Sequence, residues 1–153
     1  MPRVINFLIG NWQLDASETH QSGAPVSWGN IIFNGNLHDI PLLSGQSTVD
    51  RWFNVDAGFN RNSAQQLANN IRPFPLRLSG VRGDSQTLVN FSLLRNYAIR
   101  ERIKTQFRAE AYNALNHPVF DLPNTTPTSS TFGTVTQTIS EARGIQLALK
   151  IVF

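Results

Sequence analysis

Cysteine is absent from the 153-residue chain, and charged residues make up only 15% of it. The missing cysteine excludes disulfide bonds, thiolate zinc sites and a cysteine nucleophile. Thirteen Lys and Arg residues against ten Asp and Glu residues leave a formal charge of +3, with no run of basic residues. Such a small and scattered excess is not typical of a nucleic-acid-binding surface, so we expect no nucleic-acid partner.

Long hydrophobic runs are missing as well. No stretch approaches the roughly 18 consecutive apolar residues that indicate a membrane-spanning helix. Asn6 interrupts the apolar stretch near the start, whereas a secretory signal needs an apolar core of about 7 to 15 residues. We therefore predict no targeting segment here, and expect either a cytoplasmic chain or a piece of a longer protein whose signal lies elsewhere.

Motifs of catalysis and metal binding are also missing. His20, His38 and His117 are isolated, without a second histidine or a carboxylate at ligand spacing. Neither a phosphate-binding glycine loop nor a Gly-x-Ser-x-Gly nucleophile motif is present. We expect no enzymatic activity, no metal site and no cofactor.

Alternation with a period of two residues is the strongest pattern that the chain does contain. It predicts strands near 11–20, 87–98, 102–115 and 143–153. Arg95 interrupts the apolar face of the second strand, close to the strand end, where its long stem can snorkel. The last strand is the clearest, because every second residue in it is large and apolar: Ile145, Leu147, Leu149, Ile151 and Phe153.

The connections between these strands are unequal. A short turn at 99–101 joins the middle pair, whereas 22–85 and 116–141 are long and rich in Pro, Asn and Gly. Alternating short turns and long loops are typical of outer-membrane β-barrels. We predict an all-β fold, an antiparallel transmembrane barrel fragment of about four strands with two long extracellular loops. With the last strand running toward the periplasm, Trp12, Tyr97 and Phe153 gather at one membrane interface.

The faces opposite the apolar ones are polar in the last two strands. In a barrel, this face borders the water-filled interior, whereas in a soluble sheet it is simply solvated. We predict that five residues face the lumen: Lys104, Arg108, Glu110, Gln146 and Lys150.

Several segments resemble the end of Oar-like TonB-dependent outer-membrane receptors, which are large barrels of a type abundant in Acidobacteria and often carry a carboxypeptidase-regulatory-like domain. The resemblance covers nearly the whole chain and is most specific in its second half. It rests on residues 12–14, 21–25, 50–54, 90–96 (NFSLLRN), 106–120 (QFRAEAYNALNHPVF), 130–135, 143–150 (RGIQLALK) and Phe153.

This resemblance implies that residues 1–153 are the C-terminal part of such a barrel in the cell outer membrane. It implies TonB-dependent uptake of a bulky solute, for which this portion alone is not transport-competent. The implied partners are membrane lipid, the remaining strands and plug of the parent receptor, and TonB through the missing N-terminal part. It also implies that the barrel-assembly machinery reads the apolar series ending at Phe153 as its signal.

A second hypothesis from another class is a soluble β-sandwich that binds carbohydrate. Its contacts would come from aromatic side chains in the first long loop, namely Trp28, Trp52 and Phe53. This module would remain in solution when outer membranes are extracted, whereas a barrel portion would stay with the membrane.

Overall fold

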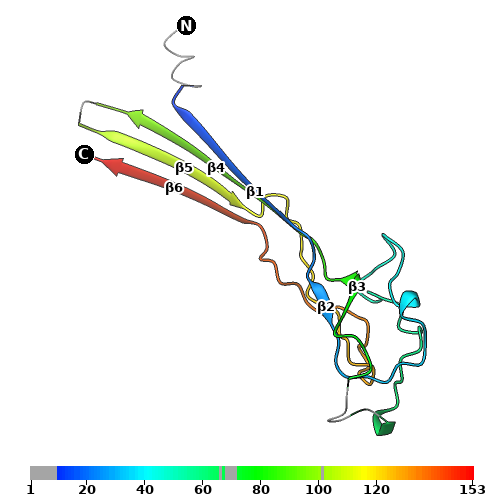
Figure 1. Cartoon of the computed structure of the whole chain (residues 1–153). Helices are drawn as coiled ribbons and strands as arrows, with labels where there is room; N and C mark the ends of the chain where they lie inside the picture. Colours follow the sequence, from blue (N-terminus) through cyan, green and yellow to red (C-terminus); the bar gives the residue numbers. More distant parts are fainter. Residues whose placement is uncertain (1–9, 66, 68–71, 101) are drawn as a thin grey trace. The chain divides into compact units, whose positions relative to one another are not determined.

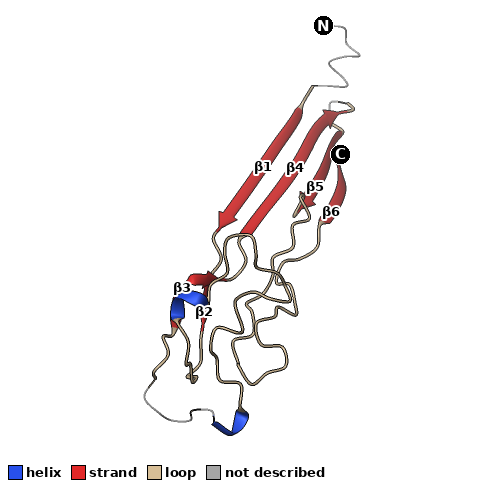
Figure 2. Cartoon of the chain, turned by 90° about the vertical axis from the view of Figure 1, so that its right-hand side faces the viewer, coloured by secondary structure: helices blue, strands red, loops and turns tan. Residues whose placement is uncertain are grey.

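Four long strands form one sheet in the computed structural model, which describes residues 10–65, 67, 72–100 and 102–153. They are β1 (Trp12–Gln21), β4 (Gln86–Ala98), β5 (Lys104–Tyr112) and β6 (Gly144–Val152). Their order across the sheet is β1-β4-β5-β6, and neighbouring strands run in opposite directions (Figures 1 and 2). Their lengths of 10, 13, 9 and 9 residues reach the roughly 9–11 residues that a tilted strand needs to cross a bilayer.

The strand register fixes which side chains share a face. Phe107 on β5 lies opposite Arg95 on β4 and opposite Leu149 on β6. At one end of the sheet, the turn between β4 and β5 is closed by the Ile99 N–H, which donates to the Ile103 carbonyl oxygen at 2.9 Å. Glu101 of the predicted turn and residues 1–9, where we predict no targeting segment, lie outside the described residues.

The chain divides into two compact units. The sheet unit comprises residues 10–20, 87–117 and 141–153 of the described chain, and the loop unit comprises the described parts of 21–86 and 118–140. Every buried hydrophobic residue in the described part of the chain belongs to the loop unit. The sheet unit therefore has strands but no hydrophobic core of its own among these residues.

The loop unit contains little regular structure. Its strands β2 (Pro25–Ser27) and β3 (Arg77–Arg82) form a two-stranded antiparallel sheet. Two single-turn 3₁₀ helices, η1 (Leu37–Asp39) and η2 (Ser63–Gln65), complete its regular elements. Among the described residues, no helix has the length and apolar character to cross a membrane.

An aromatic core holds the loop unit together. The Trp28 ring stacks on Phe59 at 5.4 Å between centroids and meets Phe53 at 4.7 Å. Phe132, from the second long segment, packs edge to face on Phe59 at 5.0 Å. Backbone hydrogen bonds also connect the two long segments, for example from the Trp52 N–H to the Gly133 carbonyl oxygen at 2.8 Å. The two segments that the sequence predicts as separate loops thus fold into one body.

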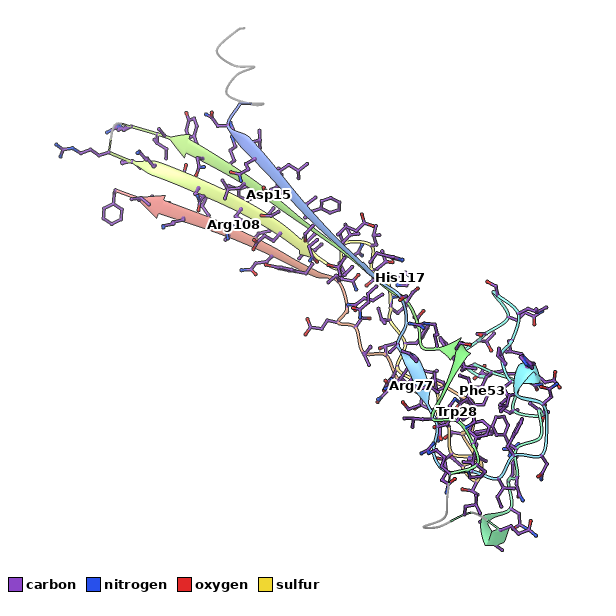
Figure 3. All side chains as sticks on the ribbon, viewed as in Figure 1. Asp15, Trp28, Phe53, Arg77, Arg108 and His117 are labelled. Atoms are coloured by element: carbon purple, nitrogen blue, oxygen red, sulfur yellow. The ribbon has the colours of Figure 1, made fainter. Side chains whose placement is uncertain are left out.

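This core corrects the carbohydrate-binding hypothesis. Trp28 is 2% exposed and Phe53 is fully buried, so neither ring is available to a sugar (Figure 3). Trp52 is half-buried, and its indole N–H donates to the Arg82 carbonyl oxygen at 2.7 Å. Their hydrophobicity serves packing inside the loop unit, because rings of this size gain about 1.5–3 kcal/mol each on full burial.

Candidate functional site

One face of the four-stranded sheet is apolar and exposed. On β6 it carries the alternating series Ile145, Leu147, Leu149 and Ile151, which are 55–71% exposed. The register continues this face onto β5 at Phe107 and Ala109, and onto β4 at Leu93. Soluble monomers rarely expose a continuous apolar surface of this kind, and such a surface marks a protein or membrane contact.

The opposite face is polar. Pairing between β5 and β6 places Lys104, Arg108 and Glu110 on it, together with Gln146 and Lys150 from β6. Arg108 Nη1 lies 3.6 Å from Glu110 Oε1, and this ion pair joins an exposed arginine to a half-buried glutamate. The face continues onto β4 and β1, where the Asn90 side-chain amide donates to Ser17 Oγ at 3.4 Å.

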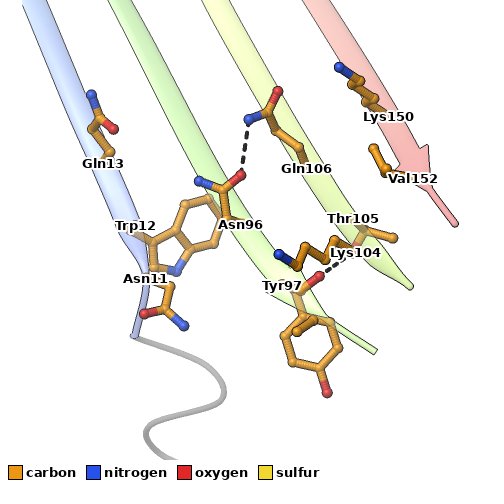
Figure 4. Close-up of a pocket in the computed structure, with 11 residues that line it drawn as sticks. Asn11, Trp12, Gln13, Asn96, Tyr97, Lys104, Thr105, Gln106, Lys150 and Val152 are labelled. Carbon is orange, nitrogen blue, oxygen red and sulfur yellow. Dashed lines mark hydrogen bonds between the residues drawn. The ribbon is translucent and has the colours of Figure 1, made fainter. Parts of the chain in front are cut away.

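A depression of about 700 Å³ lies at the end of the sheet that carries Tyr97, and its lining includes Asn96, Lys104, Gln106 and Lys150 of the polar face. The Gln106 side-chain amide donates to Asn96 Oδ1 at 2.9 Å within it (Figure 4). Lys104 and Lys150 are the charged residues among the eleven that line it. Two ammonium groups with neighbouring amides and no lining carboxylate favour the entry of negatively charged groups over positively charged ones.

At the other end of the sheet, Asn113 follows β5 and forms hydrogen bonds with neighbouring segments. Asn113 has a positive φ of 47° and is 4% exposed. Its side chain accepts from the His117 N–H at 3.1 Å and donates to the Glu141 carbonyl oxygen at 2.8 Å. Its own N–H donates to Asn90 Oδ1 at 3.0 Å. Sequence reasoning missed this residue, although its place at the end of an alternating stretch was the available signal.

The structure separates the ten predicted site residues into two groups. The five predicted to face the lumen share the polar face, and four of the five in the predicted assembly signal share the apolar face. Phe153 follows the end of β6 and is 96% exposed. Their roles in a lumen and in assembly stay predictions. The described residues contain no cluster of three or more His, Cys, Asp or Glu side chains that could hold a metal ion.

An antiparallel sheet with one exposed apolar face, one polar face and membrane-spanning strand lengths defines a portion of a transmembrane β-barrel. The family described as outer membrane beta barrel domain matches residues 1–146. The chain belongs to this family. No curated protein and no solved structure matches it significantly.

The family match confirms two predictions from the sequence. The fold is all-β and antiparallel and contains an outer-membrane β-barrel domain, and the protein localises to the outer membrane. Within the described residues, the four strands form an open sheet rather than a closed barrel. The soluble carbohydrate-binding alternative is not favoured.

Proposed function

We propose that this chain contributes four strands to an outer-membrane barrel that takes up a bulky solute in a TonB-dependent manner. The exposed apolar series on β6, directly opposite a polar face, is the observation that carries the barrel role. In the proposal, the apolar face contacts lipid and the polar face borders the water-filled interior. The TonB-dependent step is supported by the resemblance of residues 90–96, 106–120 and 143–150 to Oar-like receptors.

Unpaired strand edges explain why four strands are not sufficient. Among the residues that the structure describes, the outer edges of β1 and β6 have no neighbouring strand, and unpaired backbone groups cost several kcal/mol each in hydrocarbon. Bacterial outer-membrane barrels contain at least about eight strands. In the proposal, further strands of the parent receptor pair with both edges, a plug fills the interior, and energy arrives from TonB through the N-terminal part.

Comparing solute consumption tests the uptake proposal. Cells that lack the parent receptor, cells that lack TonB and wild-type cells are grown on one defined mixture of bulky solutes, and the spent media are compared by mass spectrometry. We expect at least one bulky solute to remain in the media of both mutants while wild-type cells consume it. Equal consumption of every solute by all three strains would overturn TonB-dependent uptake but would leave the barrel assignment intact.

The apolar series on β6 has a second proposed role in assembly. We propose that the barrel-assembly machinery recognises Ile145, Leu147, Leu149, Ile151 and Phe153 when Phe153 is the last residue of the expressed protein. Losing one exposed ring costs the folded barrel at most about 1.5–3 kcal/mol. Deleting Phe153 should therefore lower the outer-membrane level sharply while refolding in detergent stays near normal. Equal membrane levels with and without Phe153 would reduce it to an ordinary lipid contact.

A further inference from the structure

A cation interrupts the apolar face of the sheet close to one end. Arg95 lies on β4, three residues before the strand ends at Ala98, and faces Phe107 across the β4–β5 pair. Its guanidinium carbon lies 5.0 Å from the centre of the Trp12 ring. Trp12 and Phe107 meet edge to face, with their ring centroids 6.4 Å apart. Aromatic rings from β1 and β5 therefore flank this arginine on both sides.

The position of Arg95 along the strand brings its charge to the membrane surface. Three residues of strand span about 10 Å, which a tilt of about 45° reduces to about 7 Å of depth. An arginine stem is long enough to carry its guanidinium group across most of that depth toward water. The stem thus lies among the apolar side chains, while the charged end reaches the level of the lipid headgroups.

Aromatic side chains mark the same level. Trp12 begins β1 and is 40% exposed, and Tyr97 lies two residues beyond Arg95 on the same face of β4 and is 39% exposed. Tryptophan and tyrosine favour the interface, since each combines an apolar ring with a polar group. The contact with Trp12 also holds the guanidinium group in one place, which lowers the entropy cost of binding a ligand there.

We propose that Arg95, Trp12 and Tyr97 form a binding site for the phosphate group of a membrane phospholipid. The terminal N–H groups of a guanidinium form a planar fork that matches phosphate oxygens in a two-bond arrangement. The neighbouring apolar side chains Leu93, Phe107 and Leu149 provide a surface for the acyl chains. A ligand with an anionic head and apolar tails fits both parts, whereas a free anion uses only the arginine.

This inference rests on the proposed orientation of the apolar face toward lipid. The test uses the parent protein purified from outer membranes in mild detergent, stripped of lipid and titrated with phosphatidylglycerol under native mass spectrometry. We expect Arg95→Gln to weaken phosphatidylglycerol binding at least about tenfold, which corresponds to about 1.4 kcal/mol. The matched control is Arg108→Gln on the polar face of the neighbouring strand, where binding should stay at the wild-type level. Equal binding by Arg95→Gln and wild type, or equal loss in both variants, would overturn the site.

A second variant covers the case in which Arg95→Gln does not accumulate as folded protein. Trp12→Leu keeps the face apolar but removes the ring beside the guanidinium group, and it should also weaken phosphatidylglycerol binding severalfold; wild-type binding would count against the site. Inorganic phosphate at equal concentration should not displace the lipid, and effective displacement would show an anion site without lipid selectivity. Cysteine labelling of the two faces tests the orientation separately, so failure of the lipid site is distinguishable from failure of the proposed function.

Discussion

The side-chain amide of Asn113 donates a hydrogen bond to the backbone carbonyl oxygen of Glu141 across 28 positions of sequence. This bond connects the end of β5 to the segment that leads into β6. Because Asn113 also accepts from the His117 N–H, a single buried side chain satisfies backbone groups on two segments. The position of the segment that precedes β6 therefore depends on Asn113, which lies outside both β5 and β6.

Asn113→Gly should destabilise the folded protein by about 1–3 kcal/mol, because buried backbone groups lose their partners. Glycine keeps the positive φ accessible, so the effect reports on the side chain rather than on backbone strain. Asn116→Gly is the matched control, since Asn116 also has a positive φ of 51° but contributes one exposed bond of 3.2 Å to the Arg143 N–H. Chemical unfolding in detergent measures both; equal midpoints for the two variants would contradict a special role of Asn113.

The aromatic core makes a separate prediction for the loop unit. Phe53→Ala should cost about 3–5 kcal/mol, because it leaves a cavity beside Trp28 and Phe132. Protease added to whole cells should then cut within 22–85 faster than in wild type, while 86–115 stays protected. Leu43→Ala, at a side chain that is 74% exposed, should leave the cleavage rate unchanged. Protection of residues 22–85 in intact cells for every variant would contradict the extracellular location.

A pH dependence follows from Asp121 in the loop unit. The Gln137 side-chain amide donates to its carboxylate, and the Leu122 N–H adds a second bond of 2.7 Å. These bonds lower the pKa of Asp121 below its ordinary value of 3.8. The bonds stabilise the fold above that ordinary value, and their contribution is lost as the pH falls through the lowered pKa. NMR titration should show the Asp121 pKa rising toward 3.8 in Gln137→Ala; an unchanged pKa would mean that Gln137 is not the cause.

The predictability of this protein differs between its two units for a physical reason. In the sheet unit, each strand alternates between an apolar and a polar environment, so Leu147 and Lys150 reveal their faces by local position alone. In the loop unit, contacts between residues distant in sequence set the structure. Trp28 and Phe132 belong to one core although 104 positions separate them. No local period marks such residues, which is why the sequence predicts two loops and a set of exposed aromatics where the structure has one core.

Arg95 illustrates a third situation. The sequence shows it as an interruption of an apolar face, and alternation gives no reason for a cation there. The strand order supplies the reason, because β1 and β5 bring Trp12 and Phe107 to its two sides. Which residues of neighbouring strands meet is a property of the sheet, so this contact becomes visible only in three dimensions.

Site-directed labelling tests the central claim most directly, namely that the sheet separates lipid from water. The chain contains no cysteine, so single cysteines at Lys104, Arg108, Phe107 or Ala109 report without background from this part of the assembled membrane protein. Cysteines at 104 and 108 should react rapidly with a small membrane-impermeant thiol reagent, and those at 107 and 109 should be protected by lipid. A slip of one residue exchanges every face of a strand. Rapid reaction at 107 and 109 with protection at 104 and 108 would therefore contradict the orientation, and equal reaction at all four would contradict insertion of the sheet into the membrane.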